Sequence, residues 1–596
     1  MAKWTLRLAP VKSGELAQKL NIDPAIARIL AVRGYYEPEA AKRFLVAEEQ
    51  ALASPWLFAD MDKAVTVIAG ALAQGKKITV FGDYDADGIM STVILYKTLS
   101  ALGGAPDFYI PQREQEGYGL NNEAIRRLQE QGTSLLIACD NGISALEQVA
   151  YANSLGMEVV ILDHHDVPLI PDGQGKERQT LPEAAAVVDA KRQDCGYPFA
   201  HYCAAGLCYR FSQALYERLA RDWQSLAAEL LPYAVIATVC DIVQLVDENR
   251  CLVRRGLPAL AKTENVGLQA LLAAAGIAGK ELNAYHIGFV LGPCINASGR
   301  MEMAGLAVEL FLTEDRQKAE RLAEHLVALN NERRSLTEQG SALAFGQILE
   351  QGYDADKVIV LYHPDICESV AGIIAGRIKE KYYRPAVVLA GKKEYIRGSC
   401  RSVEGYNIYM ALNQCADLLQ TFGGHPLAAG LAIAPENIGE LRRRLNEICA
   451  LTDEDMQAHY RIDKALPVEQ ATLSLAKQLQ RFEPFGKGNP PVYLADRRLR
   501  LVKITLLGKE EHVMRLTFRK GERGPWEAVC FNGKERLFDL LESRLPAGSC
   551  QRLLAGNCLE PPMLDIIYTL NVNVFNNRET AQIQISDFRL SEEEAR

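Results

Sequence analysis

The sequence has no apolar run of about 18 residues, which is the length that a helix needs to cross a bilayer. Its first residues, Met1 to Arg7, also lack the apolar core of a signal peptide. The 14 cysteines include no CxxC pair, and most lie in apolar runs, where a free cysteine packs as a small hydrophobic side chain. These absences argue against a membrane span, a disulfide framework and a zinc site, and they predict a protein of the reducing cytoplasm.

An excess of positive charge is also missing. The chain has 66 Lys and Arg against 75 Asp and Glu, a net charge of −9 and a pI of about 5.7. A protein that coats nucleic acid indiscriminately usually has a basic surface, so this charge balance disfavours that class of protein. A basic groove on an otherwise acidic protein is compatible with the same balance. An apolar content of 48% is ordinary for a folded protein, and 596 residues predict several domains.

Three closely spaced aspartates are the most informative feature that is present. Asp83, Asp85 and Asp87 occupy alternate positions and directly follow the apolar run Ile78–Phe81, which predicts a buried strand. Carboxylates this close repel one another unless a cation neutralises them, and a hard divalent metal prefers such oxygen ligands. The alternative is an ordinary turn, because Asp and Gly are common turn residues.

Residues 55 to 245 alternate short apolar runs with helical patterns. Strands separated by helices predict a parallel sheet with right-handed crossovers, and such sheets place ligands at the carboxyl ends of their strands. Three of the runs end in the aspartate triplet, in Asp140 and in Asp163-His164-His165, so we expect these motifs to converge. The predicted strands are Ile78–Phe81, Leu135–Cys139, Val159–Leu162 and Ala185–Val188.

Five residues are candidate metal ligands, and one of them interrupts an apolar run that would bury it. That residue is Asp241, which needs a partner because burying an unpaired carboxylate is costly. Four carboxylates and an imidazole suit two Mn²⁺ or Mg²⁺ ions better than one, and two ions about 4 Å apart are a recurrent device for phosphodiester hydrolysis. We expect one of the two adjacent histidines to bind metal and the other to contact a substrate phosphate. The candidate ligands are Asp85, Asp87, Asp140, His164 and Asp241.

Phosphate groups require cations, and three arginines are candidates. Arg113, Arg300 and Arg401 each lie near Gly or Pro in a predicted loop, where binding residues concentrate. The guanidinium fork matches the geometry of a phosphate. For any one of them alone, a surface salt bridge is the alternative.

The rest of the chain predicts three further parts. Residues 313–352 have apolar residues at helical spacing and predict a connecting helix. Two predicted strands, 357–361 and 385–389, flank a helix at 371–380 and indicate a second α/β unit. Short alternating runs between 460 and 590 predict a small β-barrel.

The motifs, taken in chain order, resemble the four motifs of the DHH phosphoesterases: GDYDADG, CDNGIS, LDHHD and VCDIV. Three further segments are similar to the RecJ family of single-stranded-DNA-specific 5′→3′ exonucleases, and the likeness covers nearly the whole chain. These segments are Gly292–Met301, Arg397–Ser402 and Phe422–Gly430.

The resemblance implies an α/β fold. A parallel-sheet DHH domain would be joined by a long helix to a second α/β domain, the DHH-associated domain, and a C-terminal OB-type β-barrel would follow. We expect an N-terminal segment at 1–50, the DHH domain at 51–305, the connecting helix at 306–352, the DHH-associated domain at 353–455 and the OB-fold domain at 456–596.

The resemblance also implies the composition of the site. The five candidate ligands would hold the two ions, and Asp83 and His165 would lie next to the metals or the scissile phosphate. Three segments depart from the family: Cys294 replaces a frequent arginine, Asp189-Ala190 replaces a commoner Asn-Pro, and Cys367-Glu-Ser-Val370 precedes Ala371–Arg377 where Gly-Val-Ile-Gly is more frequent. Residues implied to bind backbone phosphates, the 5′ end or the enclosed substrate are Arg113, Arg300, Ser399, Arg401 and His425.

The function that the resemblance implies is release of nucleoside 5′-monophosphates from single-stranded DNA in recombination and repair. A monomer would act in the cytoplasm, with a RecQ-type helicase and a single-strand-binding protein as partners. One alternative is a DHH phosphodiesterase for short oligoribonucleotides or cyclic dinucleotides, which the predicted barrel disfavours. Another is a non-catalytic single-strand-binding replication factor, which the intact carboxylates disfavour. Barrel aromatics that either stack on bases or fill the core are Phe482, Phe485, Phe518, Trp526 and Phe531.

Overall fold

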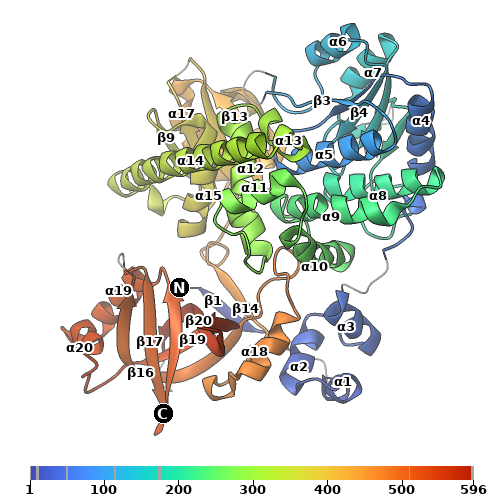
Figure 1. Cartoon of the computed structure of the whole chain (residues 1–596). Helices are drawn as coiled ribbons and strands as arrows, with labels where there is room; N and C mark the ends of the chain where they lie inside the picture. Colours follow the sequence, from blue (N-terminus) through green and yellow to red (C-terminus); the bar gives the residue numbers. More distant parts are fainter. Residues whose placement is uncertain are drawn as a thin grey trace. The chain divides into compact units, whose positions relative to one another are not determined.

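The computed structural model describes residues 2–8, 13–47, 52–112, 116–171, 177–392, 394–508 and 511–591. It forms two compact units (Figure 1). The larger unit is Ala51–Gln457, and the smaller one combines Met1–Gln50 with Ala458–Arg596. All 14 cysteines lie in the described part of the chain, and each of them is free.

The first sheet of the larger unit is parallel throughout, with the strand order β3-β2-β4-β5-β8. Alternate residues face two helical layers: Val80 and Ile137 pack with α4, α5, α8 and α9, whereas Phe81 and Ala138 pack with α6 and α7 (Figure 1). Because both faces are covered, the strands are almost continuously apolar. The elements are α4 (Met61–Ala73), β2 (Ile78–Phe81), α5 (Ala86–Ala101), β3 (Asp107–Tyr109), α6 (Asn122–Glu130), β4 (Leu135–Cys139), α7 (Leu146–Ser154), β5 (Glu158–Leu162), β8 (Ala186–Val188), α8 (Ala204–Arg218) and α9 (Trp223–Cys240).

Helix α9 is, among the described residues, the one helix that is long and apolar enough to cross a membrane by length and composition alone. Half of it is buried within the protein. Leu230 and Tyr233, both fully buried, belong to the core of the first sheet, and α9 packs against α5, α8 and α10. Its apolar composition therefore follows from its place in that core.

Helix α14 (Arg316–Glu350) is the connecting helix, 35 residues long. Asp315 caps it by accepting hydrogen bonds from the backbone N–H groups of its first turn. Leu326 packs in the core of the first sheet, and Ile348 packs in the core of the second. The helices between α9 and α14 are α10 (Asp247–Ala261), α11 (Val266–Ala274), the π-helix η3 (His286–Leu291), α12 (Gly292–Met301) and α13 (Gly305–Leu312).

The second sheet is mixed and has the order β12-β13-β11-β10-β9. Strands β9 and β10 are parallel, and the other neighbours are antiparallel. Helix α15 covers one face together with α14, and α16 and α17 cover the other. The elements are β9 (Ile359–His363), α15 (Ala371–Tyr382), β10 (Ala386–Ala390), β11 (Ile396–Arg401), α16 (Ile408–Asn413), β12 (Leu419–His425), β13 (Ala428–Ile433) and α17 (Ile438–Ile448).

The smaller unit contains the predicted barrel. Its strands follow the order β16-β17-β18-β20-β19, and pairing of β16 with β19 closes it. The N-terminal segment belongs to this unit, because β1 pairs with β14 and Arg33 forms a buried ion pair of 2.8 Å with Asp463. The elements are β1 (Lys3–Leu6), α1 (Ser13–Leu20), α2 (Pro24–Val32), α3 (Pro38–Leu45), β14 (His459–Ile462), β15 (Lys464–Ala465), α18 (Leu473–Gln480), β16 (Leu494–Leu507), β17 (Val513–Lys520), β18 (Arg523–Phe531), α19 (Lys534–Arg544), α20 (Ser549–Ala555), β19 (Met563–Phe575) and β20 (Arg578–Leu590).

Candidate functional site

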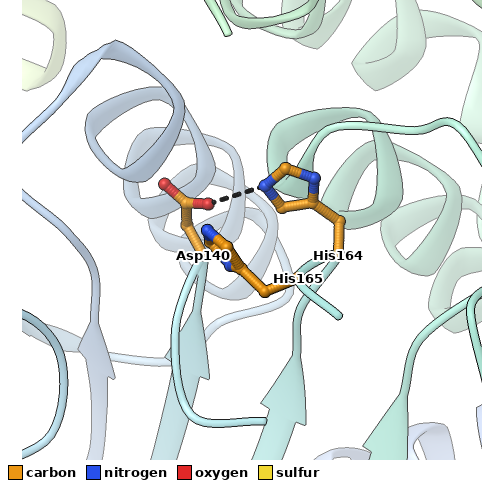
Figure 2. A group of neighbouring side chains, drawn as sticks. All are labelled: Asp140, His164 and His165. Carbon is orange, nitrogen blue, oxygen red and sulfur yellow. Dashed lines mark hydrogen bonds and ion pairs between the residues drawn. The ribbon is translucent and has the colours of Figure 1, made fainter. Parts of the chain in front are cut away.

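Side chains that follow separate strands meet at the carboxyl edge of the parallel sheet. The Nε2 atom of His164, after β5, lies 3.1 Å from Asp140 Oδ1, after β4 (Figure 2). The same nitrogen lies 3.5 Å from Asp87 Oδ2 and 3.7 Å from Asp241 Oδ2. Four residues predicted as ligands are thus neighbours, although they come from four different segments of the chain.

Three groups of donor atoms could each hold a cation, and within each group the atoms lie within 4.8 Å of one another. Asp87, His164 and Asp241 form one group, Asp83, Asp85 and Asp140 form a second, and Asp140, His164 and His165 form a third that shares members with both. The short contact between Asp140 and His164 joins the first two groups. Such adjoining groups of oxygen donors with one imidazole fit two Mn²⁺ or Mg²⁺ ions.

The turn after β2 is shaped by its own polar groups. Asp85 caps α5 by accepting hydrogen bonds from the backbone N–H groups of Asp87 and Gly88, at 2.9 and 3.2 Å. A Cβ atom at Gly88 would lie 2.4 Å from the backbone nitrogen of Asp83, so the turn requires glycine there. Asp87 accepts two more hydrogen bonds from the first N–H groups of α8, which fixes its carboxylate in the site.

The turn after β4 is held by Asn141 and Tyr118. Asp140 adopts a left-handed backbone conformation, with φ 62°, which aspartate tolerates better than most residues. The Asn141 side chain donates to the carbonyl groups of Phe81, Gly82 and Cys139, and so ties the ends of β2 and β4 together. The Tyr118 hydroxyl donates to the Asp140 carbonyl at 2.8 Å. The CDNGIS motif contains Asn141, whereas Tyr118 lies outside every motif, and neither was among the predicted site residues.

The carboxylates are held close together and away from water. Burial, reinforced by the charge of Asp85, raises the pKa of Asp87 to about 6. Burial and the neighbouring aspartates raise the pKa of Asp140 well above its usual range. Burial, together with the charge of His165, lowers the pKa of His164 to about 3, so its ring is neutral and has a free lone pair. A divalent cation would relieve the repulsion between the carboxylates, and the donor set therefore fits one.

The two adjacent histidines have different surroundings. His165 Nδ1 lies 2.7 Å from Asp163 Oδ1, and Asp163 also accepts hydrogen bonds from the N–H groups of Ile143 and His164. Burial lowers the pKa of His165, but the Asp163 carboxylate outweighs it and brings the pKa to about 9. Burial by itself raises the pKa of Asp163, but the charge of His165 and its hydrogen bond to Asp163 outweigh burial and keep the Asp163 pKa below its usual value. One ring is therefore neutral and its neighbour is cationic.

The second sheet brings donors rather than acceptors. Arg401, at the end of β11, donates to the Ser399 hydroxyl at 3.1 Å. Both groups lie against the first turn of α15, because a Cβ atom at Gly372 would lie 2.8 Å from Ser399 Oγ and 3.0 Å from Arg401 Nη2. Arg300 donates to the Ser369 carbonyl at 3.4 Å. The prediction of a loop was wrong for both arginines, because Arg300 lies in the last turn of α12 and Arg401 pairs within the second sheet as the last residue of β11.

His425 and Arg113 complete the set of predicted binding residues. The pKa of Asp166, next to the histidine pair, is lowered by its hydrogen bond to Lys191 and also by the nearby His425 at the end of β12. His425 thus lies within electrostatic range of Asp166. Arg113 lies outside the described residues.

The departure at Cys294 is accommodated by packing. Cys294 is buried, and the Asn330 side chain of α14 donates to its sulfur at 3.5 Å. Asn296, two residues later, accepts a 2.7 Å hydrogen bond from Ala86 N and so supports the turn that carries Asp85. This part of α12 therefore has a structural role that its position in the motif did not reveal.

The barrel aromatics divide into two kinds. Phe482 and Phe518 are fully buried in the core of the smaller unit, and Phe485 and Trp526 pack against that core. Phe531 is 48% exposed. The core interpretation holds for the first four, and stacking on a base stays a prediction for Phe531.

Three family models match the chain: "DHH family, N-terminal domain" over residues 77–238, "DHHA1 domain" over 355–451 and "RecJ OB domain" over 462–587. The chain is 34% identical to the single-stranded-DNA-specific exonuclease RecJ of Bacillus subtilis, over 98% of this chain and 70% of that protein. It is 31% identical to the RecJ of Dickeya dadantii, over 97% of this chain and 98% of that protein. The crystal structure of Thermus thermophilus RecJ in complex with Mn²⁺ superposes with a TM-score of 0.79 at 27% identity, over 99% of this chain and 80% of that one. The Mg²⁺ complex has a TM-score of 0.74 at 26% identity, over 99% and 79%.

Proposed function

The chain belongs to the RecJ family of single-stranded-DNA-specific exonucleases, and we propose that it removes nucleoside 5′-monophosphates from the 5′ end of single-stranded DNA. The observation that carries this proposal is the pair of adjoining donor groups at the carboxyl edge of the parallel sheet. The barrel supports a single-stranded substrate, because OB folds bind nucleic acid strands that are not base-paired.

Mn²⁺ or Mg²⁺ would be held by Asp85, Asp87, Asp140, His164 and Asp241. When bound, a pair of such ions activates water for attack on the phosphorus and offsets the charge that develops on the phosphate oxygens. The chain itself fixes the ligands: the first turns of α5 and α8 orient Asp85 and Asp87 through backbone N–H groups. The neutral His164 ring needs no deprotonation before it can act as a ligand.

The remaining polar residues would position the strand. Asp163 holds the His165 ring 2.7 Å away, and we assign that ring a hydrogen bond to a phosphate oxygen next to the metals. Asp83 would complete the surroundings of the ions, as its place in the second donor group indicates. Ser399 and Arg401 would bind backbone phosphates or the 5′ end from the other sheet, together with Arg300 on α12, Arg113 and His425.

The cellular part of the proposal rests on family membership. We assign the protein to DNA recombination and repair in the cytoplasm, acting as a monomer with a RecQ-type helicase and a single-strand-binding protein. Co-purification of the chain with each of these partners, and its mass in solution, test these assignments separately from its activity.

The experiment that tests the activity compares three labelled substrates. With Mn²⁺, we expect rapid release of 5′-mononucleotides from a 5′-labelled single strand, slow release from blunt duplex DNA and from short RNA, and none in EDTA. Equal rates on single-stranded and duplex DNA would contradict the proposal. Faster hydrolysis of the short RNA would favour an oligoribonucleotide phosphodiesterase instead.

A further inference from the structure

Two aromatic rings project from the helix that precedes α12. Tyr285 and Phe289 are 62% and 73% exposed, and their rings stack with centroids 5.1 Å apart and planes 24° from parallel. They are four residues apart, so they lie on the same side of the helix. Single exposed aromatic residues are common, but a stacked and exposed pair forms a continuous apolar surface.

The opposite side of this helix is packed against the end of α9. Ile287 and Leu291 of η3 are fully buried. A Cβ atom at Gly292 would lie 2.4 Å from the sulfur of Cys240, so only glycine lets the two helices approach this closely. The start of the helix is fixed as well, because Asn283 and His286 exchange hydrogen bonds. The rings are therefore held on a rigid support whose buried side is already complete.

The end of α9, against which this helix packs, also carries a proposed metal ligand. Asp241 follows Cys240 directly at the end of α9. The next residue, Ile242, is 65% exposed and has a φ of 56°, which is strained for a β-branched side chain. Strain of this kind is retained at functional sites when the surrounding structure enforces it. Ile242 is therefore a third exposed apolar residue, and it directly follows the proposed ligand Asp241 in the sequence.

We propose that Tyr285 and Phe289 form a stacking platform for bases of the single strand, on the α9 side of the proposed metal centre. This inference rests on the proposed function and deepens it, because it assigns a site for the bases where the arginines and histidines serve the phosphates. Unpaired bases expose their faces, and an aromatic ring binds any base face with little regard to sequence. Stacking of this kind therefore suits a nuclease that degrades strands of any sequence.

The test measures binding separately from cleavage. The full-length chain is titrated in EDTA with fluorescent oligothymidylate strands that carry one abasic residue at successive positions from the 5′ end, and affinity is measured by anisotropy. We expect one or two positions at which the abasic residue weakens wild-type binding roughly 5- to 100-fold, the range for losing one stacked base. Phe289→Ala should bind the unmodified strand more weakly by a similar factor, and an abasic residue at those positions should weaken it little further.

Matched variants separate stacking from folding. Phe289→Trp should keep wild-type affinity and position dependence, because it retains a ring. Leu349→Ala, which truncates another exposed apolar side chain (62% exposed) on α14, should bind like the wild type. Wild-type affinity of Phe289→Ala, or an undiminished abasic effect in that variant, would overturn the platform. Cleavage is measured in parallel with Mn²⁺ and tests the proposed nuclease activity independently of binding. Base-dependent binding without cleavage would support the stacking platform and refute the proposed function.

Discussion

The larger unit has two sheets (Figure 1), and they gather opposite kinds of chemistry. In the parallel sheet, the carboxyl ends of β2, β4 and β5 lie at one edge, so the residues that follow these strands meet there whatever their separation in sequence. Those residues are acceptors: aspartates and a neutral imidazole. In the mixed sheet, Ser399 and Arg401 lie along one strand; the Arg401 guanidinium is a donor, and the Ser399 hydroxyl, which accepts from it, has its own O–H to donate. The parallel strand order brings the acceptors together at one edge of the first sheet. In the second sheet, the two-residue spacing along β11 presents Ser399 and Arg401 together.

The surroundings of the donors differ accordingly. Ser399 pairs with Gly430, which in turn pairs with Gly423, so on that side of β11 no side chain rises beside the hydroxyl, whereas Val388 of β10 flanks it on the other side. Bare backbone of this kind admits the close approach of a ligand such as a sugar–phosphate chain. If this division is functional, substitutions in the first sheet should change metal binding, and substitutions in the second sheet should change binding of the single-stranded DNA.

The largest effect is expected for Asp140→Asn. It removes one carboxylate charge and keeps the left-handed backbone conformation, which Asn adopts readily. Nuclease activity should fall by about 10³-fold or more, beyond the roughly 10- to 100-fold expected for a residue that only supports a ligand. Metal content measured by mass spectrometry should fall, whereas strand affinity in EDTA should stay close to that of the wild type.

Stability gives a readout of Asp140→Asn that does not depend on activity. In EDTA the variant should be more stable by about 1 kcal/mol or more, because it relieves repulsion between buried carboxylates. Saturating Mn²⁺ should stabilise the wild type by about 2.7 kcal/mol at 100 times its Kd, and the variant by less. Asp453→Asn, at an exposed aspartate far along the chain, serves as the control for which neither difference is expected. Equal Mn²⁺ stabilisation of both proteins would remove Asp140 from the ligands.

Arg401→Ala should have the next largest effect. Loss of one charge-assisted hydrogen bond to phosphate should weaken strand binding by roughly 10- to 100-fold and lower the salt dependence of binding by about one counterion. The Mn²⁺ midpoint should not change, which is the reverse of the Asp140→Asn result. Arg444→Ala is the matched control, since Arg444, on α17, is already paired with Glu440 of the same helix and with Asp417. A shifted Mn²⁺ midpoint in Arg401→Ala would break the division between the sheets.

Much of this arrangement follows from sequence because the parallel topology obeys general rules. Strands Ile78–Phe81 and Leu135–Cys139 begin and end where their apolar runs do, and convergence of the residues behind them follows from the direction of the strands. Contacts between distant segments leave no periodic signal. Pairing of β1 with β14, the Asn141 bonds to β2 and the contact of Cys294 with α14 depend on tertiary packing, so only the structure reveals them.

The smallest predicted effect isolates the shape of the metal turn without changing any charge. Gly299, on α12, lies so close to the turn that a Cβ atom there would be 2.3 Å from the Tyr84 carbonyl oxygen, and Tyr84 directly precedes Asp85. Gly299→Ala must therefore shift backbone, which should cost about 1–3 kcal/mol in the free energy of unfolding and raise the Mn²⁺ midpoint about tenfold. DNA affinity in EDTA should fall less than in Arg401→Ala, since the second sheet is untouched and only the neighbouring Arg300 moves with the shifted backbone.

Gly346→Ala is the matched control, because Gly346 lies in the interior of α14 and a Cβ atom there would meet nothing within 4 Å. It should raise the free energy of unfolding by about 0.5–1 kcal/mol through the helix propensity of alanine and leave the Mn²⁺ midpoint unchanged. Denaturant unfolding and Mn²⁺ titration of the two variants therefore give opposite signs for stability and a difference in metal affinity. If Gly299→Ala behaved like Gly346→Ala, α12 would not support the metal turn, and the first sheet alone would have to position Asp85.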